Sequence, residues 1–224
     1  MAGKCYEEKL SSERLRAVYE SAPPRIKQHL NAEIEHVVKH IRAGDIVLEL
    51  GCGYGRVLPH LAHKACSTIG IDNSISSLML AATSLKDMSG IELACMDALS
   101  LGVCDDIFDL VVCIQNGISA FHVNQAELIR ESIRVTRPGG TILFSTYSDK
   151  FWDERLRWFE LQANLGLIGQ IDYERTTRGS IVCKDGFTAT TVSEAGFRDM
   201  LSGLDVSFHL IEIDDSSLFC VIKP

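Results

Sequence analysis

Glycines at every second position follow a short apolar run and can bring bare backbone against a ligand. The run is Ile46–Leu50, and Gly51, Gly53 and Gly55 come after it. Because glycine has no Cβ atom, such a loop can turn sharply and touch a bound molecule closely. About twenty residues beyond the first glycine, a second apolar run ends at Asp72. A carboxylate there can accept hydrogen bonds from both hydroxyls of a ribose, so the two features together predict a nucleoside site.

The spacing of the glycines indicates which kind of nucleoside. Dinucleotide sites use G-x-G-x-x-G, with the pyrophosphate at the N-terminus of the following helix. This chain has G-x-G-x-G instead, and Glu49 stands two residues before the first glycine. A carboxylate at that position would repel a pyrophosphate and suits a ligand with a cationic amino-acid tail.

This segment resembles motif I of the class I S-adenosylmethionine-dependent methyltransferases, and the resemblance continues over residues 45–147. Asp72 matches the ribose-binding acidic residue, and Asp97 matches the residue that meets the adenine amino group. The resemblance implies S-adenosylmethionine as the cofactor and S-adenosylhomocysteine as its product. The cofactor-binding residues that it implies are Glu49, Gly51, Cys52, Gly53, Asp72, Asn73, Met96, Asp97, Ala98, Gln115 and Asn116.

The same resemblance implies an α/β fold, a three-layer Rossmann-like sandwich around a seven-stranded, mostly parallel sheet with an antiparallel last strand. The length of 224 residues suits a single domain of this kind. We expect residues 1–224 to comprise a helical N-terminal cap (1–44), a cofactor-binding core (45–147), a lid insertion after the fifth strand (148–192) and a last helix with a strand pair (193–224).

Local signals place several of the elements. Apolar residues at spacings of three and four within 26–41 predict a helix that faces the core. Ser74 and Asn124 are expected to cap the helices that follow them. Two short alternating runs, 170–175 and 180–184, predict a hairpin inside the insertion.

Composition bears on the acceptor and on location. The chain has 30 acidic and 22 basic residues, a net charge of -8, whereas nucleic-acid binders generally carry a basic face. We therefore expect a small-molecule acceptor and no nucleic-acid partner. The sequence holds no apolar run long enough to cross a bilayer, and residues 1–10 carry charges where a signal peptide would be apolar. These features predict a cytoplasmic protein with no membrane partner.

Residues on the acceptor side are harder to identify, because in-line transfer from a charged sulfur needs no covalent nucleophile. His122 follows the fourth strand and is the candidate general base, with a solvent-exposed loop histidine as the alternative. Both tryptophans, Trp152 and Trp158, fall in the insertion, either as part of a substrate lid or as ordinary helix packing. His60 and His63 lack a third ligand at matching spacing, so no metal site is predicted.

These features predict an S-adenosylmethionine-dependent methyltransferase that acts on a small molecule. One alternative is a protein of the same fold with a protein or metalloid acceptor. Another is a non-catalytic, cofactor-binding partner subunit. The sequence leaves the acceptor atom and the formation of a homodimer open.

Overall fold

Seven strands form one sheet, and its topology places the glycine loop at the carboxyl edge. The computed structural model describes residues 12–224. Within them the strand order is β3-β2-β1-β4-β5-β9-β8, and β9 alone in this sheet runs antiparallel to its neighbours. The strands are β1 (Ile46–Leu50), β2 (Ser67–Asp72), β3 (Ile91–Cys95), β4 (Phe108–Cys113), β5 (Thr136–Tyr147), β8 (Ser207–Ile213) and β9 (Ser217–Lys223). The predicted fold class is confirmed.

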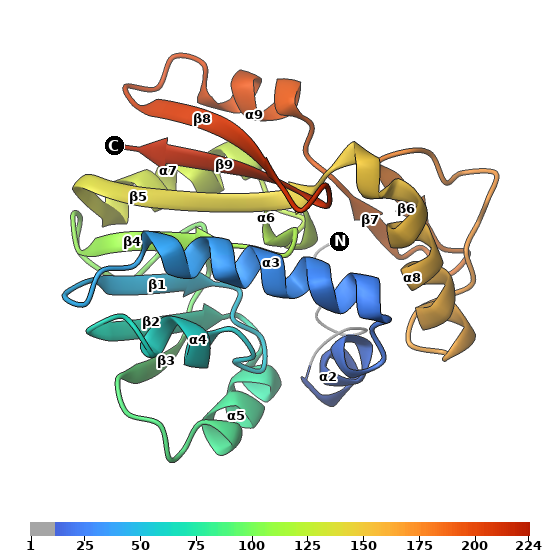
Figure 1. Ribbon diagram of the computed structural model, residues 1–224, viewed down its shortest axis with the longest axis horizontal. Helices are drawn as coiled ribbons and strands as arrows, with labels where there is room; N and C mark the ends of the chain where they lie inside the picture. The colour runs from blue at the N-terminus through green and yellow to red at the C-terminus, as the bar shows by residue number, and fades with distance from the viewer. Residues whose placement is uncertain (1–11) are drawn as a thin grey trace.

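Alternate residues of the inner strands face two helical layers, because successive side chains of a strand point to opposite faces. Val47 and Leu110 pack on the side of α3 and α4, whereas Leu48 and Val111 pack on the side of α7 and α9. Figure 1 shows α3 in front of the sheet and α7 behind it. The helices are α3 (Pro24–His40), α4 (Leu58–Ala62), α7 (Gln125–Val135) and α9 (Glu194–Leu201). No helix within residues 12–224 combines the length and the apolarity needed to cross a bilayer.

Two helices begin at the capping residues expected from the sequence. Ser74 Oγ accepts a hydrogen bond from Ser77 N at the start of α5 (Ile75–Ser84). Asn124 Oδ1 accepts from Ala126 N at 3.1 Å and from Glu127 N at 3.3 Å at the start of α7. Both predicted caps are confirmed.

The Asn124 cap gives a test of local stability away from the site. Asn124→Ala should lower the free energy of unfolding by about 1 kcal/mol, because two N–H groups of the first turn lose their side-chain acceptor. Denaturant unfolding followed by circular dichroism measures this. Asn124→Asp is the matched control, because it retains a capping oxygen and should unfold close to the native midpoint. An equal loss in both variants would contradict the capping role.

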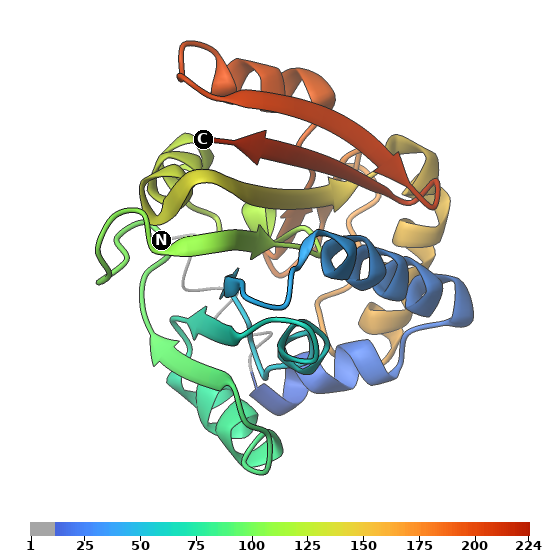
Figure 2. The same ribbon diagram turned by 60° about the vertical axis from the view of Figure 1, so that its left-hand side comes forward.

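Two helices precede β1 in the described residues, and the helical structure breaks between them at residues 21–23. α2 (Ser12–Glu20) ends before Pro23, which is the N-cap of α3. Ser12 N donates to Ser77 Oγ at 2.9 Å, so α2 lies against the start of α5. Figures 1 and 2 both show α2 beside α5. This position puts one face of α2 close to the glycine loop.

Residues 148–192 build a second small core beyond the carboxyl end of β5. They contain η1 (Asp149–Phe151), α8 (Trp152–Asn164) and a two-stranded sheet of β6 (Ser180–Val182) and β7 (Thr188–Thr190). Buried residues of this segment pack with Val18 of α2 and Ile26 of α3, among them Trp158, Phe159 and Phe187. Figure 2 shows this segment at the same end of the sheet as the start of α3.

The hairpin in this segment differs from the prediction. β6 pairs with β7, with Ile181 opposite Ala189, and Gly186 supplies a positive φ of 88° in the connecting turn. Residues 170–175 also meet 180–184 in an antiparallel arrangement, through an isolated bridge between Ile171 and Cys183 and two backbone hydrogen bonds, from Asp172 N to Val182 O and from Lys184 N to Gln170 O. The predicted pairing of 170–175 with 180–184 therefore forms only in part, and the regular ladder joins β6 to β7 instead. The tight turn at Gly186 makes the segment that follows β6, rather than the one that precedes it, its principal partner.

Candidate functional site

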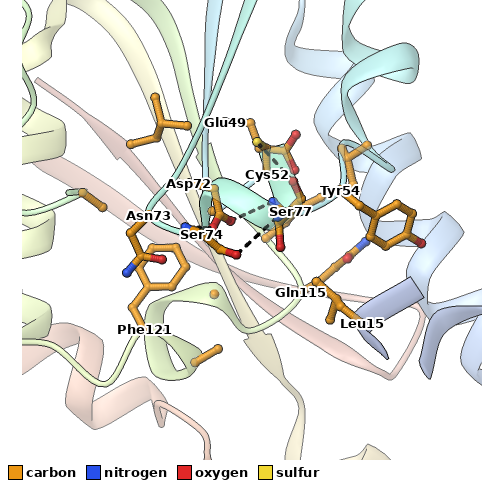
Figure 3. Close-up of a pocket in the computed structure, with 18 of the residues that line it drawn as sticks. Leu15, Glu49, Cys52, Tyr54, Asp72, Asn73, Ser74, Ser77, Gln115 and Phe121 are labelled. Carbon is orange, nitrogen blue, oxygen red and sulfur yellow. Dashed lines mark hydrogen bonds between the residues drawn. The ribbon is translucent and has the colours of Figure 1, made fainter. Parts of the chain in front are cut away.

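A cavity of about 180 Å³ lies at the carboxyl ends of β1, β2, β3 and β4, beside α2. We call it the main cavity, and Figure 3 shows residues that line it. All the predicted cofactor-binding residues except Asn116 line this cavity: Glu49, Gly51, Cys52, Gly53, Asp72, Asn73, Met96, Asp97, Ala98 and Gln115. Residues from four separate strand ends, those of β1, β2, β3 and β4, are thus brought together, as expected for a crevice outside a parallel sheet.

The glycine loop forms one wall of the main cavity. Gly51 and Gly53 have φ angles of 72° and 54°, a region that other residues rarely adopt. A Cβ atom on Gly51 would overlap the ring of Phe121 on the opposite wall. Cys52 N donates to Ile71 O at 2.8 Å and fastens the loop to β2. The loop therefore presents backbone where a side chain could not fit.

Asp72 joins the tip of β2 to this loop. Its Oδ2 accepts from Gly53 N and its Oδ1 accepts from Ser74 N, both at 2.8 Å (Figure 3). Burial raises the pKa of the carboxyl group, and the backbone hydrogen bonds act against that rise. Each carboxylate oxygen can accept more than one hydrogen bond, so the fixed carboxylate can still receive hydroxyl donors from a ligand.

Glu49 and Arg56 bring an acidic and a basic side chain to the same cavity. Glu49 is 4% exposed, and its Oε2 has no hydrogen-bond partner within residues 12–224. Burial raises the pKa of Glu49 to about 8, although the charge of Arg56 opposes that rise. The Arg56 guanidinium stacks 4.5 Å from the centre of the Tyr19 ring, and its Nε and Nη2 lack partners in the same part of the chain. A carboxyl group and a guanidinium side by side complement a group that carries both an ammonium and a carboxylate.

Sequence reasoning missed Arg56. It directly follows Gly55, and the glycine pattern predicts the backbone conformation of the loop but not the role of the side chain after it. In the family that the sequence resembles, N-terminal helices often close over the cofactor, which makes Tyr6 and Tyr19 candidates for a contact with it. Tyr19 lines the main cavity. Tyr6 lies outside the described residues.

Asp97 closes the side of the main cavity near β3. Its Oδ1 accepts from Leu99 N at 2.9 Å, and its carbonyl accepts from Ser100 N at 3.0 Å. These bonds hold the turn after β3 and fix the carboxylate beside Met96 and Ala98. The contact with adenine that the resemblance implies for Asp97 stays a prediction.

A smaller cavity of about 40 Å³ adjoins the main one, and we call it the side cavity. Both cavities share Leu15, Tyr19, Gln115 and Ala120. Its other lining residues are Val18, Asn116, Tyr147, Trp158, Phe159, Gln162, Ala189 and Thr190. Asn116, predicted as a cofactor residue, therefore lies here. Tyr147, the last residue of β5, also lines this cavity, whereas Asp149, two residues further on, lines neither cavity.

A buried carboxyl group holds the backbone between the two cavities. Gln115 and Asn116 have φ angles of 58° and 64°, which are strained for residues other than glycine. Gln115 N donates to Glu33 Oε2 at 2.7 Å, and Ser145 and Ser217 donate their hydroxyls to the same carboxyl group at 2.9 and 2.7 Å. Burial raises the pKa of Glu33 to about 7. Sequence reasoning also missed Glu33, whose only signal is an acidic residue within the apolar stripe of α3.

His122, the candidate base, lies at the rim of the site. It lines neither cavity, although Phe121 and Val123 on either side of it line the main one. Its backbone has a φ of 52°, and partial burial lowers the pKa of the imidazole. The structure therefore does not place His122 among the residues that enclose a ligand.

Comparison with known proteins gives a family for the central part of the chain. Residues 47–140 match a family model described as a methyltransferase domain. Methyltransferase GfsG of Streptomyces halstedii is 35% identical over 109 residues, which are 46% of this chain and 37% of that protein. Malonyl-(acyl-carrier protein) O-methyltransferase of Marinomonas sp. (strain MWYL1) is 32% identical over 128 residues, 54% of this chain and 45% of that protein. The chain thus spans less than half the length of these curated relatives.

A solved structure resembles nearly the whole chain. It is N-methyltransferase NodS from Bradyrhizobium japonicum WM9, in complex with S-adenosyl-L-homocysteine. The TM-score is 0.65 with 15% sequence identity, and the match covers 99% of this chain and 97% of that one. At this identity the likeness concerns the fold.

Proposed function

We propose that this chain, whose residues 47–140 form a class I S-adenosylmethionine-dependent methyltransferase domain, transfers a methyl group from S-adenosylmethionine to a small molecule. The family predicted from the glycine loop and Asp72 is confirmed by the match over these residues. The observation that carries the proposed activity is the main cavity. It brings together the fixed carboxylate of Asp72, atoms of Glu49 and Arg56 that lack hydrogen-bond partners within residues 12–224, and bare glycine backbone.

Different residues of the main cavity would bind different parts of the cofactor. Asp72 would accept the ribose hydroxyls, and Asp97 would accept the adenine amino group, with Asn73, Met96 and Ala98 beside the base. Gly51, Cys52 and Gly53 would pass under the sugar and the sulfur. Glu49 would bind the ammonium of the amino-acid tail, and Arg56 its carboxylate.

The chain's own task is then positioning and exclusion of water. Bound S-adenosylmethionine supplies a methyl group that its positive sulfur already activates. Gln115 lines both cavities, so the residues around it would align an acceptor in the side cavity with the cofactor. The strained backbone of Gln115, held by Glu33, would keep this boundary rigid. The aromatic side chains of the side cavity would keep water away from the reacting atoms.

Two observations favour a small acceptor. The side cavity is small and its walls come from inside the domain, including residues of the segment 148–192. We propose that this segment is the lid of the acceptor site, since Trp158, Phe159 and Ala189 all belong to it. The net charge of -8 also favours an acceptor other than a nucleic acid.

Two measurements test the proposed function. Isothermal titration with S-adenosylhomocysteine should show binding at a single site, and a transfer assay with S-adenosylmethionine labelled in its methyl group should move label into a metabolite fraction. Binding without transfer to any metabolite would favour the non-catalytic partner subunit. Label in a protein fraction would favour a protein acceptor. Failure to bind S-adenosylhomocysteine would overturn the proposal.

We propose His122 as the base, acting from the rim through a water. His122→Ala should then slow turnover about tenfold, less than the loss of a base in direct contact, while S-adenosylhomocysteine binds as before. Turnover against pH measures this, and the histidine-dependent limb of the profile should disappear. His60→Ala, on the exposed side of α4, is the matched control. A native rate in His122→Ala removes the histidine from the mechanism.

A further inference from the structure

The walls of the side cavity suit a flat ligand. Tyr147 from β5 and both Trp158 and Phe159 from α8 line it, and all three side chains are less than a tenth exposed. The rings of Trp158 and Phe159 meet nearly edge to face, with centroids 6.2 Å apart. Aromatic walls of this kind bind planar groups through offset or edge contacts. The cavity volume, about that of three water molecules, admits the end of a compact ring rather than a bulky chain.

Two residues that line the side cavity have buried hydrogen-bond donors without an acceptor in the described part of the chain. Trp158 is 4% exposed, and its Nε1 has no partner within residues 12–224. An indole N–H can only donate. Gln115 Nε2 is likewise buried without a partner in that range. Asn116, by contrast, is bonded already, since its Oδ1 accepts from Thr146 Oγ1 and its Nδ2 donates to Thr190 O.

A buried arginine lies behind the aromatic walls of the side cavity. Arg155 is 1% exposed, and its Cζ lies 4.8 Å from the centre of the Tyr147 ring and 5.5 Å from that of Phe159. Its Nη2 donates to Ala189 O at 2.8 Å, directly behind the cavity. No acidic residue lines the cavity in the described part of the chain.

We propose that the side cavity takes an oxygen acceptor, a phenol or an enol, and that Trp158 donates a hydrogen bond to an oxygen of this molecule. This rests on the proposed methyl transfer and specifies its acceptor. The names of the relatives do not choose the atom, since they include an O-methyltransferase and an N-methyltransferase. The unpartnered donors favour oxygen, because an amine acceptor would place its own N–H groups against the indole N–H of Trp158.

The transfer balances without a further reactant. The hydroxyl gives up its proton through a water to His122, the proposed base at the rim, and the indole N–H of Trp158 favours the anion that remains. An oxygen lone pair then forms the bond to the methyl carbon. The electron pair of the broken carbon–sulfur bond returns to sulfur, which becomes a neutral thioether.

Two probes of nearly the same shape test this acceptor class. 4-Nitrophenol and 4-nitroaniline differ in one group, a hydroxyl or an amine, and the anion of the first absorbs visible light. On protein saturated with S-adenosylhomocysteine, 4-nitrophenol should bind at least about tenfold more tightly and should ionise at a lower pH than in water. Trp158→Phe keeps an aromatic wall but removes the donor, so this preference should fall to about twofold or less.

The outcomes separate the acceptor from the function itself. Equal binding of the two probes, tighter binding of 4-nitroaniline, or binding of neither probe would overturn the oxygen acceptor while S-adenosylhomocysteine still bound. An unchanged preference in a Trp158→Phe protein that binds S-adenosylhomocysteine normally would overturn the role of Trp158. Loss of S-adenosylhomocysteine binding in the native protein would overturn the proposed function, and the acceptor with it. The preference for 4-nitrophenol over 4-nitroaniline is measured on the native protein. The test of the acceptor class therefore stands even if Trp158→Phe folds poorly.

Discussion

Affinity for S-adenosylhomocysteine should rise about 50-fold between pH 6 and pH 8, and level off above pH 8. In the free protein, burial raises the pKa of Glu49 to about 8, so at neutral pH most of the molecules carry a neutral carboxyl group there. A cofactor ammonium beside this group would favour the carboxylate and lower its pKa. Binding would therefore release a proton, and acid would oppose it. From pH 6 to pH 8 the gain is about 50-fold, because half of the carboxyl groups are still protonated at pH 8, and it reaches about 100-fold at higher pH.

Isothermal titration at several pH values, in buffers of different ionisation enthalpy, measures both the affinity and the proton released. Glu49→Gln should bind about as weakly as the native protein does near pH 6, and its affinity should not change over this range. The matched ligand is 5′-methylthioadenosine, which keeps the nucleoside but lacks the amino-acid tail. It should bind with little dependence on pH in either protein. A slope that survives in Glu49→Gln would assign the titration to another group.

The fold could be predicted from the sequence where local patterns determine structure. The apolar stripe of α3 and the caps Ser74 and Asn124 act through residues a few positions apart, so they can be recognised without tertiary information. The hairpin of the insertion could not be predicted in the same way. Both 170–175 and β7 are short and suitable as partners for β6, and a tight turn with positive φ at Gly186 favours β7. Alternation alone does not distinguish neighbours of this length.

The same distinction applies to the site. The predicted cofactor residues of the main cavity belong to motifs at the ends of successive strands, and the parallel topology brings such ends together. Glu33 acts on Gln115, 82 positions away, and on Ser217, 184 positions away. Trp158 meets Tyr19 across a similarly long stretch of chain. These contacts depend on how α2, α3 and α8 pack, and no local pattern encodes them.

Asp72→Ala should weaken binding of S-adenosylhomocysteine by about 1 to 3 kcal/mol, or roughly 5- to 150-fold, while the fold persists. The carboxylate would accept the ribose hydroxyls, and hydrogen bonds to a charged acceptor are stronger than neutral ones. The same side chain also accepts from Gly53 N and Ser74 N, so its removal loosens the glycine loop as well. Asp72→Asn retains one acceptor oxygen and should fall between the native protein and Asp72→Ala.

A cycle that combines Asp72→Ala with loss of the hydroxyls in the ligand separates these two effects. The native protein should bind adenosine more tightly than 2′,3′-dideoxyadenosine, because only adenosine can donate to the carboxylate. Asp72→Ala should remove most of this difference, whereas a loosened loop would weaken both ligands equally and keep their ratio. Competition against S-adenosylhomocysteine measures all four affinities. If the ratio in Asp72→Ala equals the native ratio, Asp72 serves the loop and some other residue holds the ribose.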